Sequence, residues 1–148
     1  MPKLKDVYIE GIYRAEARNS LTLPLFVTSI SAGFPSPADD YIDKRLDLNE
    51  FLIRHPAATF FVRVSGDSMI DAGIHPDDIL IVDRAVEAVN NKIVIAVLNG
   101  ELTVKRLRIE GEAVYLYPEN DEYSPIEITP QMQFEVWGVV IHVIHSIK

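Results

Sequence analysis

The sequence predicts a mainly β fold, a curled and partly barrel-like sheet with one or two short helices and an extended N-terminal arm. Three observations predict it. From residue 59 onward, short apolar runs alternate with turn residues, as in an antiparallel sheet. Only residues 46–52 have the spacing of an amphipathic helix, and residues 1–20 show no regular hydrophobic period. With 148 residues, 48% of them hydrophobic, the chain is expected to form one domain with room for an appendage.

The N-terminal region is expected to be an arm followed by a linker. Residues 1–20 are interpreted as a mobile arm or a short extended piece. Residues 21–30 are apolar and partly β-branched, so we expect them to dock as a strand on the edge of a sheet. Residues 31–40 (SAGFPSPADD) contain two prolines and several small residues, which predicts an extended, exposed linker. Such a linker serves either as a hinge or as a bond that a protease can reach.

The body begins with a short amphipathic helix predicted from the spacing of Leu46, Leu48, Phe51 and Leu52. It should end before Pro56, and either Asp47 or Asn49 would be its N-cap. Strands are then expected at residues 59–64, 79–82, 93–98, 101–109, 114–117 and 134–147. The dipeptide Asn99-Gly100 favours a tight hairpin between the third and fourth of these strands. The last strand is apolar on both faces, which we interpret as an edge covered by a second copy of the chain.

Composition excludes several classes of function. The chain has no cysteine, so disulfides, thiolate catalysis and cysteine-based zinc sites are excluded. A net charge of −8 argues against direct binding of nucleic acid, because an acidic surface repels phosphates. No apolar run approaches the roughly 20 residues of a membrane span. An export signal is also not expected, because carboxylates precede residues 21–30 and polar residues interrupt them.

The sequence predicts no cofactor and no metal site. Neither a Walker loop nor a GxGxxG pattern is present, and the histidines form no HExxH spacing. His142 and His145 are three residues apart in a predicted strand, so they should point to opposite faces. We therefore interpret all four histidines as structural or surface residues: His55, His75, His142 and His145. The acidic pairs and clusters lie at predicted turns, where carboxylates are common.

Ser68 is the first candidate for chemistry. It lies in residues 65–69 (SGDSM), directly after a predicted strand and before a segment long enough for one helical turn. At the start of a helix, unpaired N–H groups can hold an oxyanion, so a serine there is well placed as a nucleophile. The same position is also common for a serine that only caps the helix. The turn alone favours the cap.

Lys105 is the second candidate. On its predicted strand it shares a face with Thr103, Leu107 and Ile109. Burial disfavours the charged ammonium, so a partly desolvated lysine can serve as a neutral general base for a serine. The alternative is a strand lysine whose stem lies on apolar neighbours while its amine stays in water. The residues alone favour this second reading.

Several motifs together resemble one family. They are residues 65–69 (SGDSM), 73–74 (GI), 77–83 (DDILIVD), 100–105 (GELTVK), 34–38 (FPSPA), 48–49 (LN) and 138–143 (GVVIHV). This combination resembles the UmuD family, the self-cleaving subunits of error-prone DNA polymerases, which are related to LexA-type repressors and signal peptidases. The resemblance extends over essentially everything from Leu23 onward, whereas the first 20 or so residues look longer than is typical.

The resemblance implies specific roles. Ser68 would be the nucleophile, Lys105 the base, and Ala32-Gly33 the bond that is cut. The backbone N–H groups of Asp67 and Ser68 would hold the oxyanion. Residues 1–32 would then be an arm removed by self-cleavage, and residues 33–148 a β-rich Ser-Lys peptidase-like dimerisation domain.

The resemblance also implies partners and a place in the cell. The protein would be a cytoplasmic homodimer whose self-cleavage is stimulated by a RecA filament on single-stranded DNA. The cleaved form would join a UmuC-like Y-family polymerase and support mutagenic bypass of DNA lesions in the SOS response, with no cofactor and no membrane. The alternative is a non-catalytic dimeric module that regulates a polymerase and in which Ser68 is only a cap. A repressor is disfavoured, because 32 residues are too few for a helix-turn-helix domain.

Overall fold

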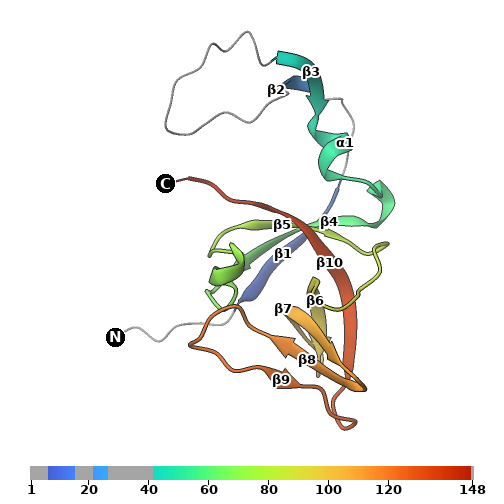
Figure 1. Ribbon diagram of the computed structural model, residues 1–148, viewed down its shortest axis with the longest axis vertical. Coiled ribbons are helices and arrows are strands. Elements are labelled where there is room, and N and C mark those ends of the chain that lie inside the picture. The colour runs from blue at the N-terminus through green and yellow to red at the C-terminus, as the bar shows by residue number, and fades with distance from the viewer. Residues whose placement is uncertain (1–6, 16–21, 27–41, 148) are drawn as a thin grey trace.

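The structure is a computed structural model that describes residues 7–15, 22–26 and 42–147 (Figure 1). Its strands are β1 (Tyr8–Arg14), β2 (Thr22–Phe26), β3 (Ile42–Asp47), β4 (Thr59–Ser65), β5 (Ile79–Asp83), β6 (Ile93–Leu98), β7 (Glu101–Glu110), β8 (Ala113–Tyr117), β9 (Ile126–Glu127) and β10 (Phe134–Ile144). The helices are α1 (Leu48–Leu52) and two single 3-10 turns, η2 (Pro56–Ala58) and η3 (Ile70–Ala72). The predicted mainly β fold is confirmed.

Eight of the strands form one antiparallel sheet in the order β1-β4-β5-β10-β6-β7-β8-β9. The sheet curls into a half-barrel (Figure 1), so that the edge strand β1 comes close to β7, which is five places away in the order. The curl has a direct consequence for function, because it brings the end of β4 over the middle of β7. In the part of the chain that the structure describes, no helix is long and apolar enough to cross a membrane.

The N-terminal arm is extended over residues 8–14. These residues form β1, which pairs antiparallel with β4 from Tyr8 opposite Ser65 to Arg14 opposite Phe60. The second of the two expectations for residues 1–20, a short extended piece, is therefore confirmed for this part of the arm. Val7, which precedes the strand, is buried in the core with 2% of its surface exposed.

The next segment is also a strand, but its partner differs from the prediction. β2 pairs with β3 in a separate two-stranded sheet, with Thr22 opposite Asp47 and Phe26 opposite Ile42. The sequence did not predict β3, because its central residues are charged. The predicted linker at residues 31–40 lies outside the described residues, and so does the bond between Ala32 and Gly33.

The helix and hairpin predictions are confirmed. Asp47 is the N-cap of α1, and its carboxylate accepts a hydrogen bond from Asn49 N at 2.9 Å. β6 and β7 form the predicted hairpin. Its turn residues Asn99 and Gly100 both have positive φ values, 50° and 82°, as a tight two-residue turn requires.

The prediction that the last strand is a sheet edge is wrong. β10 lies inside the sheet, where its first half pairs with β6 and its second half with β5. The strand is apolar on both faces because it runs between the two halves of the curled sheet (Figure 1). Among its apolar residues, only the last two, Val143 and Ile144, are exposed.

The core consists of two apolar clusters. The one beneath the candidate site joins β1, β4, the turn after β4, β5, β6 and β7, through Val7, Val62, Val64, Met69, Ile74, Leu80, Val82, Ile95 and Val104. The other joins β6, β7, β8 and β10 through Val94, Ala96, Leu107, Leu116 and Val139. The two segments of the candidate site, residues 66–74 and β7, both contribute to the first cluster.

Candidate active site

Ser68 lies in the turn that follows β4. Gly66 has a φ of 84°, a value that glycine adopts without strain, and it reverses the chain at the end of the strand. The 3-10 turn η3 begins only at Ile70, and its N-cap is Met69. Ser68 is fully buried, and its Oγ accepts hydrogen bonds from Val7 N at 3.3 Å and Lys105 Nζ at 3.5 Å. The interpretation of Ser68 as a helix cap is therefore wrong.

Lys105 is in the middle of β7 and is 2% exposed. Its Nζ donates to Thr103 Oγ1 at 2.9 Å and to Val104 O at 3.2 Å, as well as to Ser68 Oγ. The prediction that Lys105 and Thr103 share a buried face is confirmed. The alternative, an amine that stays in water, is wrong. Lys105 Nζ is therefore shielded from water and in contact with Ser68 Oγ.

Ser68 and Lys105 are 37 residues apart: Ser68 follows β4 and Lys105 lies in β7, and these two strands are not neighbours in the sheet. β4 is the second strand in the order and β7 the sixth, so only the curl of the sheet brings the two side chains together. A nucleophile and a base in hydrogen-bond contact are the minimal set for acyl transfer. Their distance of 3.5 Å is slightly longer than the 2.6–3.2 Å of an engaged pair, as is common before a substrate is in place.

The turn that carries Ser68 is held by the loop after β8. Asn120 Nδ2 donates to Asp67 O at 2.9 Å, and Tyr123 Oη donates to Asp67 Oδ1 at 2.7 Å. Glu119 N donates to Ser68 O at 2.8 Å. The sequence does not predict the role of these residues, because a Pro-Glu-Asn-Asp turn has the same residue pattern whether it is exposed to solvent or packed on another loop. No local pattern marks their role.

A model of the Peptidase S24-like family matches residues 24–141 of this chain. The chain belongs to the Peptidase S24-like family. This is a family of self-cleaving serine peptidases. The chain is 45% identical to MucA of Salmonella typhimurium over 82% of this chain and 83% of MucA. It is 46% identical to ImpA of Salmonella typhimurium over 88% of both chains.

MucA and ImpA are UmuD-family proteins, so the resemblance predicted from the motifs is confirmed. The similarity extends to the LexA repressor of Colwellia psychrerythraea, at 37% identity over 84% of this chain and 58% of the repressor. The residues matched by the S24 family model include Ser68 and Lys105 but begin after β1. The strand that brings Val7 to Ser68 is therefore outside the family match.

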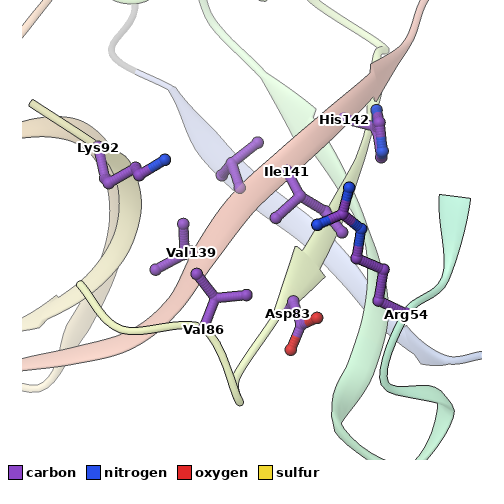
Figure 2. A pocket seen from close by; sticks show the side chains of 8 residues that line it. Arg54, Asp83, Val86, Lys92, Val139, Ile141 and His142 are labelled. Atoms are coloured by element: carbon purple, nitrogen blue, oxygen red, sulfur yellow. The ribbon is translucent and has the colours of Figure 1, made fainter. Parts of the chain in front are cut away.

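This S24-family chain keeps its Ser-Lys pair covered. Val7 packs in the same apolar cluster as Met69 and Ile74, which both follow Ser68 in the chain. Neither Ser68 nor Lys105 lines the pocket of about 290 Å³ shown in Figure 2. That pocket lies beside β10 and is lined by Arg54, Asp83, Val86, Lys92, Val139, Val140, Ile141 and His142.

Two of the histidines have structural contacts, as predicted. His142 packs against the ring of Phe51. His55 is paired with the buried carboxylate of Asp83, with Nδ1 and Oδ2 2.5 Å apart. His75 and His145 both lie against a second buried carboxylate, Asp78. The sequence does not predict that two histidines share Asp78, because 67 residues separate Asp78 from His145.

Proposed function

We propose that this chain is a UmuD-like self-cleaving serine peptidase in which Ser68 is the nucleophile, Lys105 the general base and Ala32-Gly33 the bond that is cut. The observation that carries the proposal is the contact between Ser68 Oγ and Lys105 Nζ at 3.5 Å, with both side chains almost completely buried. Membership of the S24 family supports it. A structural serine and lysine would have little reason to share a dry contact, because desolvating an amine is costly.

The proposed reaction follows serine-lysine chemistry. Neutral Lys105 Nζ takes the hydroxyl proton while Ser68 Oγ attacks the carbonyl carbon of Ala32. The tetrahedral intermediate then breaks its bond to the nitrogen of Gly33, which receives the proton from Lys105. Water hydrolyses the ester that links residue 32 to Ser68, with Lys105 again acting as the base. Because the substrate belongs to the same chain or its dimer partner, effective concentration replaces affinity.

The oxyanion donors proposed for this reaction are the backbone N–H groups of Asp67 and Ser68. Within residues 7–15, 22–26 and 42–147, neither group donates a hydrogen bond, so both are available to an oxyanion. The carbonyl groups of the same two residues are held by Asn120 and by the backbone of Glu119. The bond to Asp67 O fixes the peptide plane that also contains the Ser68 N–H, so this donor is oriented in advance, which is the source of catalytic stabilisation by such groups.

The structure also supplies a brake for the proposed reaction. A hydroxyl oxygen has two acceptor lone pairs, and in Ser68 these receive the Val7 N–H and the Lys105 amine. An oxygen that accepts two hydrogen bonds has no lone pair free to attack a carbonyl. Self-cleavage therefore requires that Val7 leave Ser68 and that the amine change from donor to acceptor.

We further propose the cellular role that the UmuD family suggests. The protein acts in SOS mutagenesis as a cytoplasmic homodimer, is stimulated to cut itself by a RecA filament on single-stranded DNA, and then serves a Y-family polymerase in translesion synthesis. The similarity to MucA and ImpA supports this role. Exposed apolar side chains near the C-terminus, Val143, Ile144 and Ile147, support a dimer, since a second copy would cover them. The filament would bias an existing equilibrium toward the engaged arm.

Intact-mass spectrometry tests the proposal. The chain is incubated at alkaline pH, with and without activated RecA filament, and fragments of residues 1–32 and 33–148 are expected under both conditions, faster with filament. Ser68→Ala should stay intact throughout. An uncut wild-type chain under both conditions would favour the non-catalytic regulatory module, as would cleavage that survives Ser68→Ala. Cleavage at alkaline pH that the filament does not accelerate would support the peptidase activity but contradict its stimulation by RecA.

A further inference from the structure

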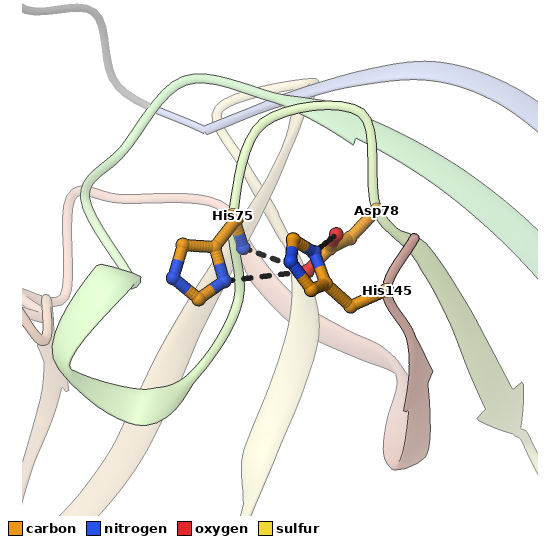
Figure 3. Close-up of side chains that lie close together, drawn as sticks. All are labelled: His75, Asp78 and His145. Carbon is orange, nitrogen blue, oxygen red and sulfur yellow. Dashed lines mark hydrogen bonds and ion pairs between the residues drawn. The ribbon is translucent and has the colours of Figure 1, made fainter. Parts of the chain in front are cut away.

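Two histidines and one carboxylate meet at the far end of β10. Asp78 directly precedes β5, and His75 lies three residues before Asp78. His145 directly follows β10 (Figure 3). Asp78 is only 2% exposed. His145 Nδ1 is 2.6 Å from Asp78 Oδ1, and His75 Nδ1 is 3.8 Å from Asp78 Oδ2. One ligand atom from each of the three residues lies within 4.8 Å of the other two.

His75 carries an unsatisfied nitrogen in this cluster. Its Nδ1 is buried and has no hydrogen-bond partner. A buried polar atom without a partner costs free energy, so native proteins usually satisfy it with protein, water or an ion. Figure 3 shows the ring of His75 directed toward the carboxylate of Asp78, with the ring of His145 beside it. The two ring centroids are 4.8 Å apart. The open nitrogen therefore faces the other two candidate ligands.

The three ligand atoms suit one kind of ion. Two imidazole nitrogens and a carboxylate oxygen are the ligands that zinc and similar divalent metals take in sites where a fourth position is left to water. With metal–ligand distances of about 2.0–2.1 Å, ligands of a tetrahedral ion are about 3.3 Å apart. The present separations of 2.6 Å and 3.8 Å bracket this value. Rotations of side chains alone can reach it.

The surroundings of the cluster also favour a cation. The side chains of His75 and His145 are 40% and 45% exposed, so an ion can enter from solvent. The backbone is fixed, because His75 N donates to Asp78 Oδ2 at 2.8 Å and Asp78 N donates to His75 O at 3.1 Å. The net charge of −8 attracts cations to the protein as a whole.

We propose that His75, Asp78 and His145 bind a divalent transition-metal ion of the zinc class, with water in the remaining position. The site lies apart from the Ser-Lys pair and does not depend on self-cleavage. It joins two segments that are distant in the sequence, the loop before β5 and the chain end after β10. That loop also hydrogen-bonds to β4, through Asp77 N to Val64 O at 2.9 Å and Val64 N to Asp78 O at 3.1 Å. A bound ion would clamp the loop next to the strand that leads to Ser68.

The residues matched by the S24 family model end at residue 141. His145 is therefore beyond the match, so the proposed site is a property of this chain rather than one that the family model supplies. The chain also offers a matched control. His55 and Asp83 form a similar pair of a histidine and a buried carboxylate, but no third ligand accompanies them within the described residues. A general affinity of His-Asp pairs for zinc would appear at both places.

The test is a titration of the full metal-free chain with zinc chloride, followed by calorimetry, and with cobalt chloride, followed by visible absorption. We expect one zinc ion per chain and the ligand-field bands of four-coordinate cobalt. His75→Ala and His145→Ala should each weaken zinc binding by about tenfold or more, because each removes one of three protein ligands. His55→Ala should bind zinc like the wild type. The melting temperature should rise with zinc in the wild type and in His55→Ala, but not in the double variant His75→Ala/His145→Ala.

Two results would overturn the proposal. One is wild-type binding no tighter than that of the double variant, which would make the cluster an ion-pair network only. The other is an equal loss of affinity in His55→Ala, which would mean that zinc binds histidines without a defined site. Melting without added metal shows whether each variant is folded, so a loss of binding in a folded variant supports the site.

Discussion

Strand β1 should act as the brake on self-cleavage, and Val7 is the residue through which to test it. Val7→Ala keeps the backbone N–H that donates to Ser68 Oγ but removes two methyl groups from a side chain that is 2% exposed. At about 0.8 kcal/mol for each buried carbon, the substitution weakens docking of the arm by about 1.5 kcal/mol, and by more if a cavity remains. The undocked population should then rise roughly 5- to 30-fold.

Self-cleavage at alkaline pH should accelerate by the same factor, because the rate is proportional to the population in which Ser68 is free. The assay is intact-mass spectrometry of the fragment of residues 33–148 over time, at equal protein concentration. Ile12→Val is the matched control on the same strand. It removes one carbon from a side chain that is 38% exposed, so it should change stability by only about 0.5 kcal/mol and the rate by about twofold.

A Val7→Ala chain that cleaves no faster than Ile12→Val would contradict the brake. A slower rate in a chain that melts like the wild type would contradict it more strongly, because Val7 would then assist the reaction. Melting temperatures separate undocking of the arm from unfolding of the body.

Three further predictions follow from the same contacts. Thr103→Val removes the hydroxyl that holds Lys105 Nζ at 2.9 Å, so self-cleavage should slow by about tenfold while the melting temperature changes little, and an unchanged rate would exclude a positioning role for Thr103. Tyr123→Phe removes the hydrogen bond to Asp67 Oδ1, so the free energy of unfolding in urea should fall by about 1 kcal/mol and self-cleavage should slow. A loss of stability with no change in rate would show that the turn does not depend on Tyr123 for its catalytic geometry. Gly138→Ala should lower stability by about 1–3 kcal/mol, because the added Cβ would lie 2.6 Å from Val82 Cγ1, and a melting temperature equal to the wild type would contradict this packing.

Local patterns were enough to predict much of this fold. The Asn99-Gly100 turn, the apolar runs of β5 and β6 and the Asp47 cap are each determined by neighbouring residues, and each is present as predicted. The neighbour of Lys105 could also be predicted, because alternation along a strand assigns Lys105 to the same face as Thr103. Its partner Ser68 came from a turn motif and a family resemblance rather than from any spacing between the two.

The features that were missed depend on contacts between distant segments. β3 is rich in charged residues and β1 shows no regular hydrophobic period, so both are strands because β2 and β4 pair with them, not because of their own pattern. An apolar strand inside a sheet and an edge strand covered by a second copy have the same pattern of apolar residues. The pattern of β10 therefore did not show that this strand lies inside the sheet. The shared use of Asp78 by two histidines could not be predicted either, because it depends on the pairing of β5 with β10, which places Ile79 opposite Ile144.

The most direct test of the central claim is the rate of self-cleavage as a function of pH in the wild type and in Lys105→Ala. The wild-type rate should rise with pH, because a general base acts only in its unprotonated form and must accept the proton of the Ser68 hydroxyl. Lys105→Ala should remain uncut over the whole range while retaining its fold, as judged by circular dichroism. A Lys105→Ala chain that is cut between Ala32 and Gly33 at the wild-type rate would contradict the assignment of Lys105 as the base.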